Sequence, residues 1–210
     1  MSLAQAERAA LVETLRDTGP DAPTLCAGWS ARDLVAHLVI RERRPDTAPG
    51  IVVPPLAPYT EKVRRGTAER DWADLLDALA SGPPLYSPLF LVDRWANLAE
   101  MFVHHEDVLR GGAAPDSDWT PRPLSRDLEK ALLRPLRLVG RLTVRSSPAA
   151  VSLRTPDGSE VLRGGRGRPV TVTGPVSELV LFAYGRAPVA VAFDGDAEAV
   201  DALRAAPRGI

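Results

Sequence analysis

The chain has 210 residues, a length that fits one large domain or two small ones. Its formal net charge is -1 at pH 7, and this balance argues against binding to nucleic acid or to an anionic membrane. No apolar run is long enough to cross a bilayer, and the N-terminus lacks a basic-then-apolar targeting signal. The single cysteine, Cys26, cannot form an internal disulfide, so we expect a cytoplasmic protein.

Helical patterns dominate the chain up to about residue 145. Ser2 with Gln5, and Ser30 with Asp33, have the spacing of capping boxes, which mark helix starts. Glycine and proline mark most of the expected helix ends. The expected helices cover residues 2–17, 30–43, 71–80, 88–110 and 125–144.

One long connection interrupts these helices. Five prolines fall between Pro45 and Pro58, and we expect them to break any regular element there. Connections of this length are uncommon inside a compact domain and are often functional or mobile.

After Pro148 the pattern changes to short alternating segments that are typical of strands. A Pro156-Asp157-Gly158 turn separates the first two segments and predicts a hairpin. The expected strands cover residues 151–155, 160–163, 170–173 and 189–193, with helices at 174–184 and 197–206. The sequence therefore predicts an α+β protein, with a helical domain at 1–147 and a small α+β domain at 148–210.

All three histidines lie in two of the expected helices. Glu100 and His104 are four residues apart, so a helix stacks them on one face. His37 lies in an earlier helix, and packing of the two helices could bring it to the pair. Two histidines and one carboxylate hold a divalent metal and leave a coordination position open, as in catalytic zinc sites. A metal ion would also supply the positive charge that a buried Glu100 needs.

The same residues have a plainer interpretation, in which Glu100 and His104 share a hydrogen bond in the core of a structural helical protein. His105 points about 100° away from His104 on a helical wheel. It is therefore expected to pack in the core or to support a ligand from outside. Asp107 either accepts the free ring N–H of His104 or is an exposed carboxylate at the helix end.

Three stretches of the chain, Cys26–Leu38, Asn97–Val108 and Gly174–Arg186, are similar to a known family. The first two resemble the DinB-like superfamily, in its actinobacterial branch with the mycothiol-dependent maleylpyruvate isomerase type of N-terminal domain. The third is similar to the C-terminal domain that accompanies it. The resemblance implies a four-helix bundle with one long crossover, which the segment Pro45–Pro58 fits.

The resemblance also implies a bound divalent metal, usually zinc. Nickel and manganese are the alternatives that we consider. The implied ligands are His37, Glu100 and His104. Family members with known activity use a low-molecular-weight thiol, mycothiol or bacillithiol, as cofactor or co-substrate. The expected partners are therefore a small-molecule thiol and a small electrophilic substrate, and the expected reaction is that of a transferase or an isomerase.

Other features leave alternatives open. Arg186 could bind a carboxylate of the substrate or thiol, or it could satisfy carbonyl groups at a helix end. Cys26 could coordinate the metal, although a small packed cysteine is the plainer interpretation. No residue pattern assigns the catalytic residues or the substrate, so a non-catalytic metal- or ligand-binding module is the alternative function. Faces of the bundle could also form a homodimer.

Overall fold

The structure is a computed structural model that describes residues 1–207, and the side chains of residues 51–52, 88–89 and 91–96 lie outside this description. The chain divides into two compact units, with the first spanning Met1–Gly112 and the second beginning at Ala113. The first unit is helical, and the second combines helices with a four-stranded sheet. The predicted α+β class is confirmed.

The helices that begin at Leu3, Ala31, Trp72 and Pro88 lie where the sequence predicted helices. Ser2 and Ser30 each form a capping box, with Gln5 and Asp33 respectively, so two backbone N–H groups at each helix start have partners. The main helices are α1 (Leu3–Thr18), α2 (Ala31–Arg43), α4 (Ala57–Ala68), α5 (Trp72–Ala80) and α6 (Pro88–Leu109).

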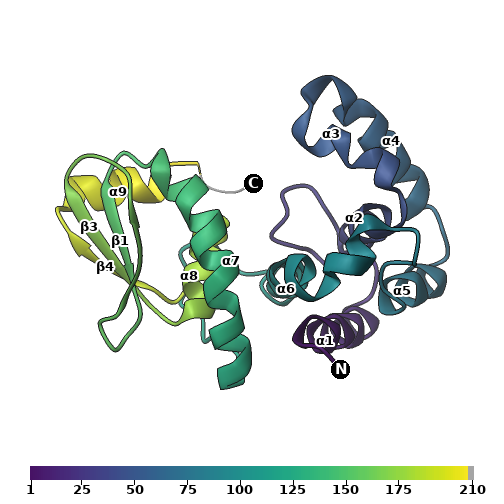
Figure 1. The fold of residues 1–210 in the computed structure, drawn as a ribbon, viewed down its shortest axis with the longest axis horizontal. Coiled ribbons are helices and arrows are strands. Elements are labelled where there is room, and N and C mark those ends of the chain that lie inside the picture. The colour runs from purple at the N-terminus through teal and green to yellow at the C-terminus, as the bar shows by residue number, and fades with distance from the viewer. Residues whose placement is uncertain (208–210) are drawn as a thin grey trace. The chain divides into compact units, whose positions relative to one another are not determined.

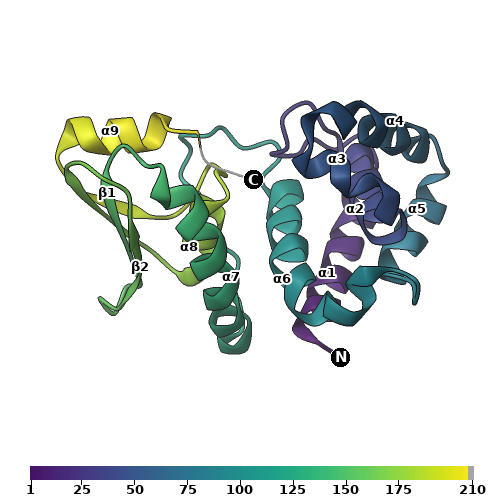
Figure 2. The ribbon, with the colours of Figure 1, turned by 45° about the horizontal axis from the view of Figure 1, so that its top comes forward.

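The core of this unit lies between α1, α2, α5 and α6. Helix α6 packs along α1, and α5 contacts both α1 and α2 (Figures 1 and 2). Helix α2 also contacts α6, and this contact carries the candidate site. The fully buried side chains of the core are mostly leucines, which include Leu11, Leu15, Leu34, Leu38, Leu75 and Leu79.

The proline-rich connection contains short helices, contrary to the expectation of no regular element. They are η1 (Pro45–Thr47), α3 (Pro49–Val52) and η2 (Pro54–Leu56). Each begins at a proline, which is tolerated at the first position because the N–H there has no partner within the helix. Helix α4 follows and packs on α2; it has no counterpart among the predicted elements.

The second unit holds the sheet, in the order β2-β1-β3-β4. Strand β1 is antiparallel to β2 and parallel to β3, and β3 is antiparallel to β4. The elements of this unit are α7 (Arg126–Arg145), β1 (Ala150–Arg154), β2 (Glu160–Gly164), β3 (Pro169–Thr173), α8 (Val176–Ala183), β4 (Ala192–Gly195) and α9 (Ala197–Ala205).

Strand β4 begins three residues later than the predicted segment at 189–193. The backbone N–H of Ala190 donates to the Glu178 carboxylate at 2.8 Å, and the N–H of Val191 donates to the carbonyl of Val189 at 3.1 Å. These bonds form a turn, so the valine-rich start of the predicted strand does not pair with β3.

Helix α7 was expected as the last helix of an N-terminal domain that ends at residue 147. In the structure it packs on α8 and β2, and the compact units separate earlier, after Gly112. Its buried face, which includes Leu132, Leu136 and Val139, serves the core of the second unit. Among the residues described, no helix combines the length and apolar character that a membrane span requires.

Candidate metal centre

Helix α2 places His37 at the edge of a buried helix face. Leu34 and Leu38 on either side of it are 0% exposed, so they anchor α2 in the core. The His37 side chain keeps 21% of its surface exposed. Its ring also lies against the ring of Trp29, with centroids 5.2 Å apart. The histidine is therefore held by packing while its Nε2 faces α6.

Helix α6 supplies the other two predicted ligands. The Oε1 atom of Glu100 lies 3.6 Å from Nε2 of His37 and 3.3 Å from Nε2 of His104. One ligand atom from each of the three residues lies within 4.8 Å of the other two. Ligands around a zinc ion are about 2.0–2.2 Å from it, so donor atoms at these separations can share one ion. The arrangement fits a divalent cation.

Electrostatics at the site favours a charged Glu100. Burial alone would raise its pKa, but hydrogen bonds with His104 and His37 hold that pKa well below the usual value. Burial lowers the pKa of His37, and the carboxylate of Glu100 only partly opposes this. Neutral His37 and ionised Glu100 are the forms that bind metals.

His104 is held between carboxylates on its two sides. Its Nδ1 atom lies 2.9 Å from Oδ2 of Asp107, which is fully buried. Burial would lower the pKa of His104, but hydrogen bonds with Asp107, Cys26 and Glu100 raise that pKa well above its ordinary value. An ion bound at Nε2 would displace the proton there and leave the Nδ1 proton on Asp107.

Cys26 joins this cluster from the segment before α2. Its thiol donates to Oδ2 of Asp107 at 3.2 Å, and its Sγ lies 3.9 Å from Nδ1 of His104. Cys26, His104 and Asp107 therefore form a second group of potential ligands, which shares His104 with the first. The first group would bind an ion through Nε2 of His104, and the second through Nδ1.

Two residues at the site were not predicted from the sequence. Arg41 lies one turn after His37 on α2, and its Nε is 3.3 Å from Oε1 of Glu100. The His-x-x-x-Arg spacing was a signal that could have found it. Trp29 lies outside α2, and no local pattern links it to His37.

Helix α4 contributes to the surroundings of the site through Arg64. Its guanidinium lies 4.9 Å from the centre of the Trp29 ring and 2.5 Å from Oδ1 of Asp33. It also forms two bonds of 2.8 Å with Glu61. Arg64 thus links α4 to the start of α2 and to the aromatic ring beside His37.

The two remaining candidates have other partners than the three ligands. The ring of His105 bonds to α1, with Nδ1 2.7 Å from Oε1 of Glu7 and Nε2 2.9 Å from Oγ1 of Thr14. It therefore supports helix packing rather than the ligand cluster. Arg186, in the second unit, donates to the carbonyl of Tyr184 at 3.1 Å, as expected for an arginine at a helix end.

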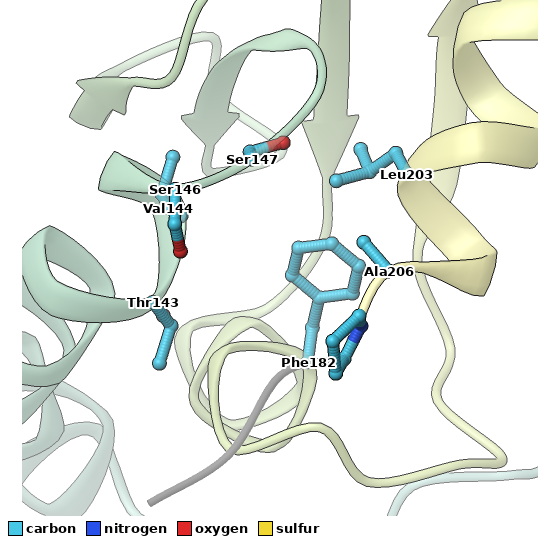
Figure 3. A pocket seen from close by; sticks show the side chains of 8 residues that line it. Thr143, Val144, Ser146, Ser147, Phe182, Leu203 and Ala206 are labelled. Carbon is cyan, nitrogen blue, oxygen red and sulfur yellow. The ribbon is translucent and has the colours of Figure 1, made fainter.

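A separate cavity of about 150 Å³ lies within the second unit (Figure 3). Thr143, Val144, Phe182 and Leu203 are among its lining residues. None of the described residues that line it is an acid, a base or a cysteine. Among the described residues, its lining therefore lacks the imidazole and carboxylate groups that gather in the first unit.

Comparisons with known proteins concern the family and the fold of the chain. The family model "Mycothiol maleylpyruvate isomerase N-terminal domain" matches residues 2–109, just over half of the chain. A crystal structure of a mycothiol-dependent maleylpyruvate isomerase is similar over 91% of this chain and 90% of that chain, with a TM-score of 0.58. The sequences are 14% identical, so this likeness concerns the fold. No curated protein matches the chain significantly. The matched region shows that the chain belongs to the mycothiol maleylpyruvate isomerase N-terminal domain family.

Proposed function

We propose that the protein is a metal- and thiol-dependent isomerase that acts on a small electrophilic substrate. The observation that carries the proposal is that Nε2 of His37 and Nε2 of His104 both face the same carboxylate oxygen, Oε1 of Glu100. A divalent ion bound by these residues, zinc first among the choices, would lower the pKa of a thiol at its remaining coordination position.

The residues of the chain have distinct tasks in this proposal. The Nε2 atoms of His37 and His104 and the carboxylate of Glu100 hold the ion. Asp107 accepts the Nδ1 proton of His104 and so directs Nε2 toward the ion. Trp29 covers one side of His37 and limits the access of water to that ligand.

Family membership supports the thiol and the reaction class. The structural relative is described as mycothiol-dependent and as a maleylpyruvate isomerase, so we propose mycothiol as the thiol and a cis-alkene as the substrate. Addition of a thiolate to a conjugated double bond permits rotation about the resulting single bond. Elimination of the thiolate then returns the trans isomer and the thiol unchanged. Transfer of the thiol to the electrophile would require the same first step without the elimination.

The activity has a direct test. We expect zinc-loaded protein to convert maleylpyruvate only when mycothiol is also present, and metal-stripped protein to be inactive. Loss of the cis isomer can be followed by proton NMR. Fully loaded protein that ignores mycothiol, bacillithiol and glutathione at millimolar concentration would contradict the thiol chemistry. That result would favour a non-catalytic metal-binding module.

The role of Asp107 yields a prediction about metal affinity. Asp107→Asn keeps the shape of the side chain but removes the charge that holds the Nδ1 proton of His104. Loss of such an outer partner typically weakens metal binding by about 10–100-fold. Because an amide can still accept one hydrogen bond, we expect a loss near tenfold, measured by competition with a chromogenic zinc chelator. An unchanged zinc affinity would show that Asp107 does not orient His104.

A further inference from the structure

Arg41 places a positive charge beside the Glu100 carboxylate oxygen that faces both histidines. Its Nε lies 3.3 Å from Oε1 of Glu100, the same atom that faces both Nε2 atoms of the histidines. The side chains of Arg41, Glu100 and His37 are 17%, 21% and 21% exposed, so none of the three is fully buried. We propose that Arg41 is an anion-binding residue that takes a carboxylate group of the ligand at the metal. The inference rests on the proposed metal site.

The net charge around a bound metal ion favours an anionic ligand at Arg41. Without an ion, the single negative charge of Glu100 offsets the guanidinium of Arg41. With a divalent ion bound to Glu100, the ion and Arg41 carry three positive charges between them. The carboxylate of Glu100 offsets one, so two remain. Asp107, behind His104, offsets only one of them. Cations this close repel one another strongly in a partly buried site, and an anionic ligand between them would relieve the repulsion.

Buried neighbours keep the guanidinium at this position. The Oδ1 atom of Asn97 accepts from Nη1 of Arg41 at 2.5 Å, and Asn97 is 0% exposed. The amide of Asn97 donates in turn to Oε1 of Glu42 at 3.2 Å, which fixes its orientation. Glu42 is paired with Arg8, so this pair adds no net charge.

The geometry also leaves a donor for a ligand. Among the described side chains, Glu100 and Asn97 are the polar partners of Arg41, and they engage Nε and Nη1. Its Nη2 group is not used by either partner. A guanidinium matches the planar shape of a carboxylate, which favours a carboxylate as the bound anion.

Zinc affinity tests the charge argument. Arg41→Gln removes the positive charge and keeps an amide donor for Asn97. We expect zinc to bind about tenfold more tightly to this variant, because the repulsion is gone. Arg41→Lys keeps the charge and should bind zinc like the wild type. Arg32→Gln is the matched control, since Arg32 lies on the same helix but bonds to the carbonyls of Ala68 and Arg70.

Acetate binding tests whether Arg41 binds an anion. The expected effect of Arg41→Gln is opposite to its effect on zinc: the affinity for acetate falls. Cobalt-loaded protein is titrated with acetate, and the visible absorption of the metal reports binding. We expect Arg41→Gln to bind acetate about tenfold more weakly than the wild type, although it holds the metal more tightly. A residue that only supported Glu100 would weaken metal binding when it is replaced, and that result would overturn the inference.

Further probes distinguish the source of the carboxylate. Mercaptoacetate carries a thiol and a carboxylate, whereas 2-mercaptoethanol carries the thiol alone. If Arg41 takes a carboxylate of the thiol, the preference for mercaptoacetate disappears in Arg41→Gln. If it takes a carboxylate of the electrophile, acetate still binds when 2-mercaptoethanol occupies the metal, and this binding depends on Arg41. If the wild type binds metal but Arg41→Gln has the same zinc and acetate affinities as the wild type, the inference about Arg41 is overturned and the proposed function stands. A wild type without metal would overturn the proposed function and the inference together.

Discussion

His37→Ala is expected to abolish tight zinc binding, whereas Cys26→Ala is expected to leave it intact. The two substitutions separate the two groups of potential ligands that share His104. Loss of His37 removes one of three ligands, so the zinc affinity should fall by about 100-fold or more, beyond the usual cost of losing an outer hydrogen-bond partner. Loss of Cys26 removes a thiol that donates to Asp107, and Asp107 keeps its bond with His104.

Elemental mass spectrometry of purified protein checks this prediction. We expect about one equivalent of zinc in the wild type and in Cys26→Ala, and little in His37→Ala. Cys26 and His37 are both partly exposed, so we expect the two variants to fold. Circular dichroism checks that they do. The reverse pattern, with zinc retained in His37→Ala and lost in Cys26→Ala, would place the ion on Cys26, His104 and Asp107.

Arg110→Ala is expected to destabilise the N-terminal unit by about 3–5 kcal/mol, the cost of breaking a buried ion pair from one side. Arg110 donates from Nε and Nη2 to Oε2 of Glu106, at 2.8 and 2.7 Å. The two side chains are only 1% and 2% exposed. Without the guanidinium, the Glu106 carboxylate would stay buried with much of its hydration lost.

Urea unfolding followed by tryptophan fluorescence measures this effect. The control is Arg16→Ala, which removes a similar intrahelical pair with Glu13 at the surface, where the side chains are 47% and 69% exposed. An exposed pair contributes about 0–1 kcal/mol, so this variant should unfold close to the wild type. An Arg110→Ala protein with the same free energy of unfolding as the control would show that water reaches Glu106.

Local patterns predicted most helices because their signals lie within a few residues. The capping boxes at Ser2 and Ser30 each satisfy backbone groups of the first turn, and the structure contains both. Helix α4 has no such signal, and its buried residue is Arg64, which is held by Asp33 and Glu61. The ion pair with Asp33 joins α4 to α2, and the periodicity of the sequence does not reveal such a contact.

The candidate site was predictable in part for the same reason. The spacing of Glu100 and His104 places them on one face of a helix, and it also separates His105 from them. The approach of His37 to this pair depends on how α2 packs on α6, so the resemblance to a family supplied the link. Trp29 reaches His37 from a segment outside the helix, and this contact has no sequence pattern.

Helix α7 shows the limit of composition as a guide to domains. Its sequence is helical, like the segments before it, which suggested that it belongs with them. Its buried leucines instead meet α8 and β2. An amphipathic pattern specifies that a face is buried and leaves open which unit covers it.

X-ray absorption spectroscopy of the zinc-loaded protein, in the absence of any thiol, tests the central claim most directly. A site made of His37, Glu100 and His104 predicts nitrogen and oxygen neighbours at about 2.0–2.2 Å, with the scattering pattern of two imidazole rings. A sulfur neighbour at about 2.3 Å with a single imidazole would contradict it, because Cys26 would then be a ligand.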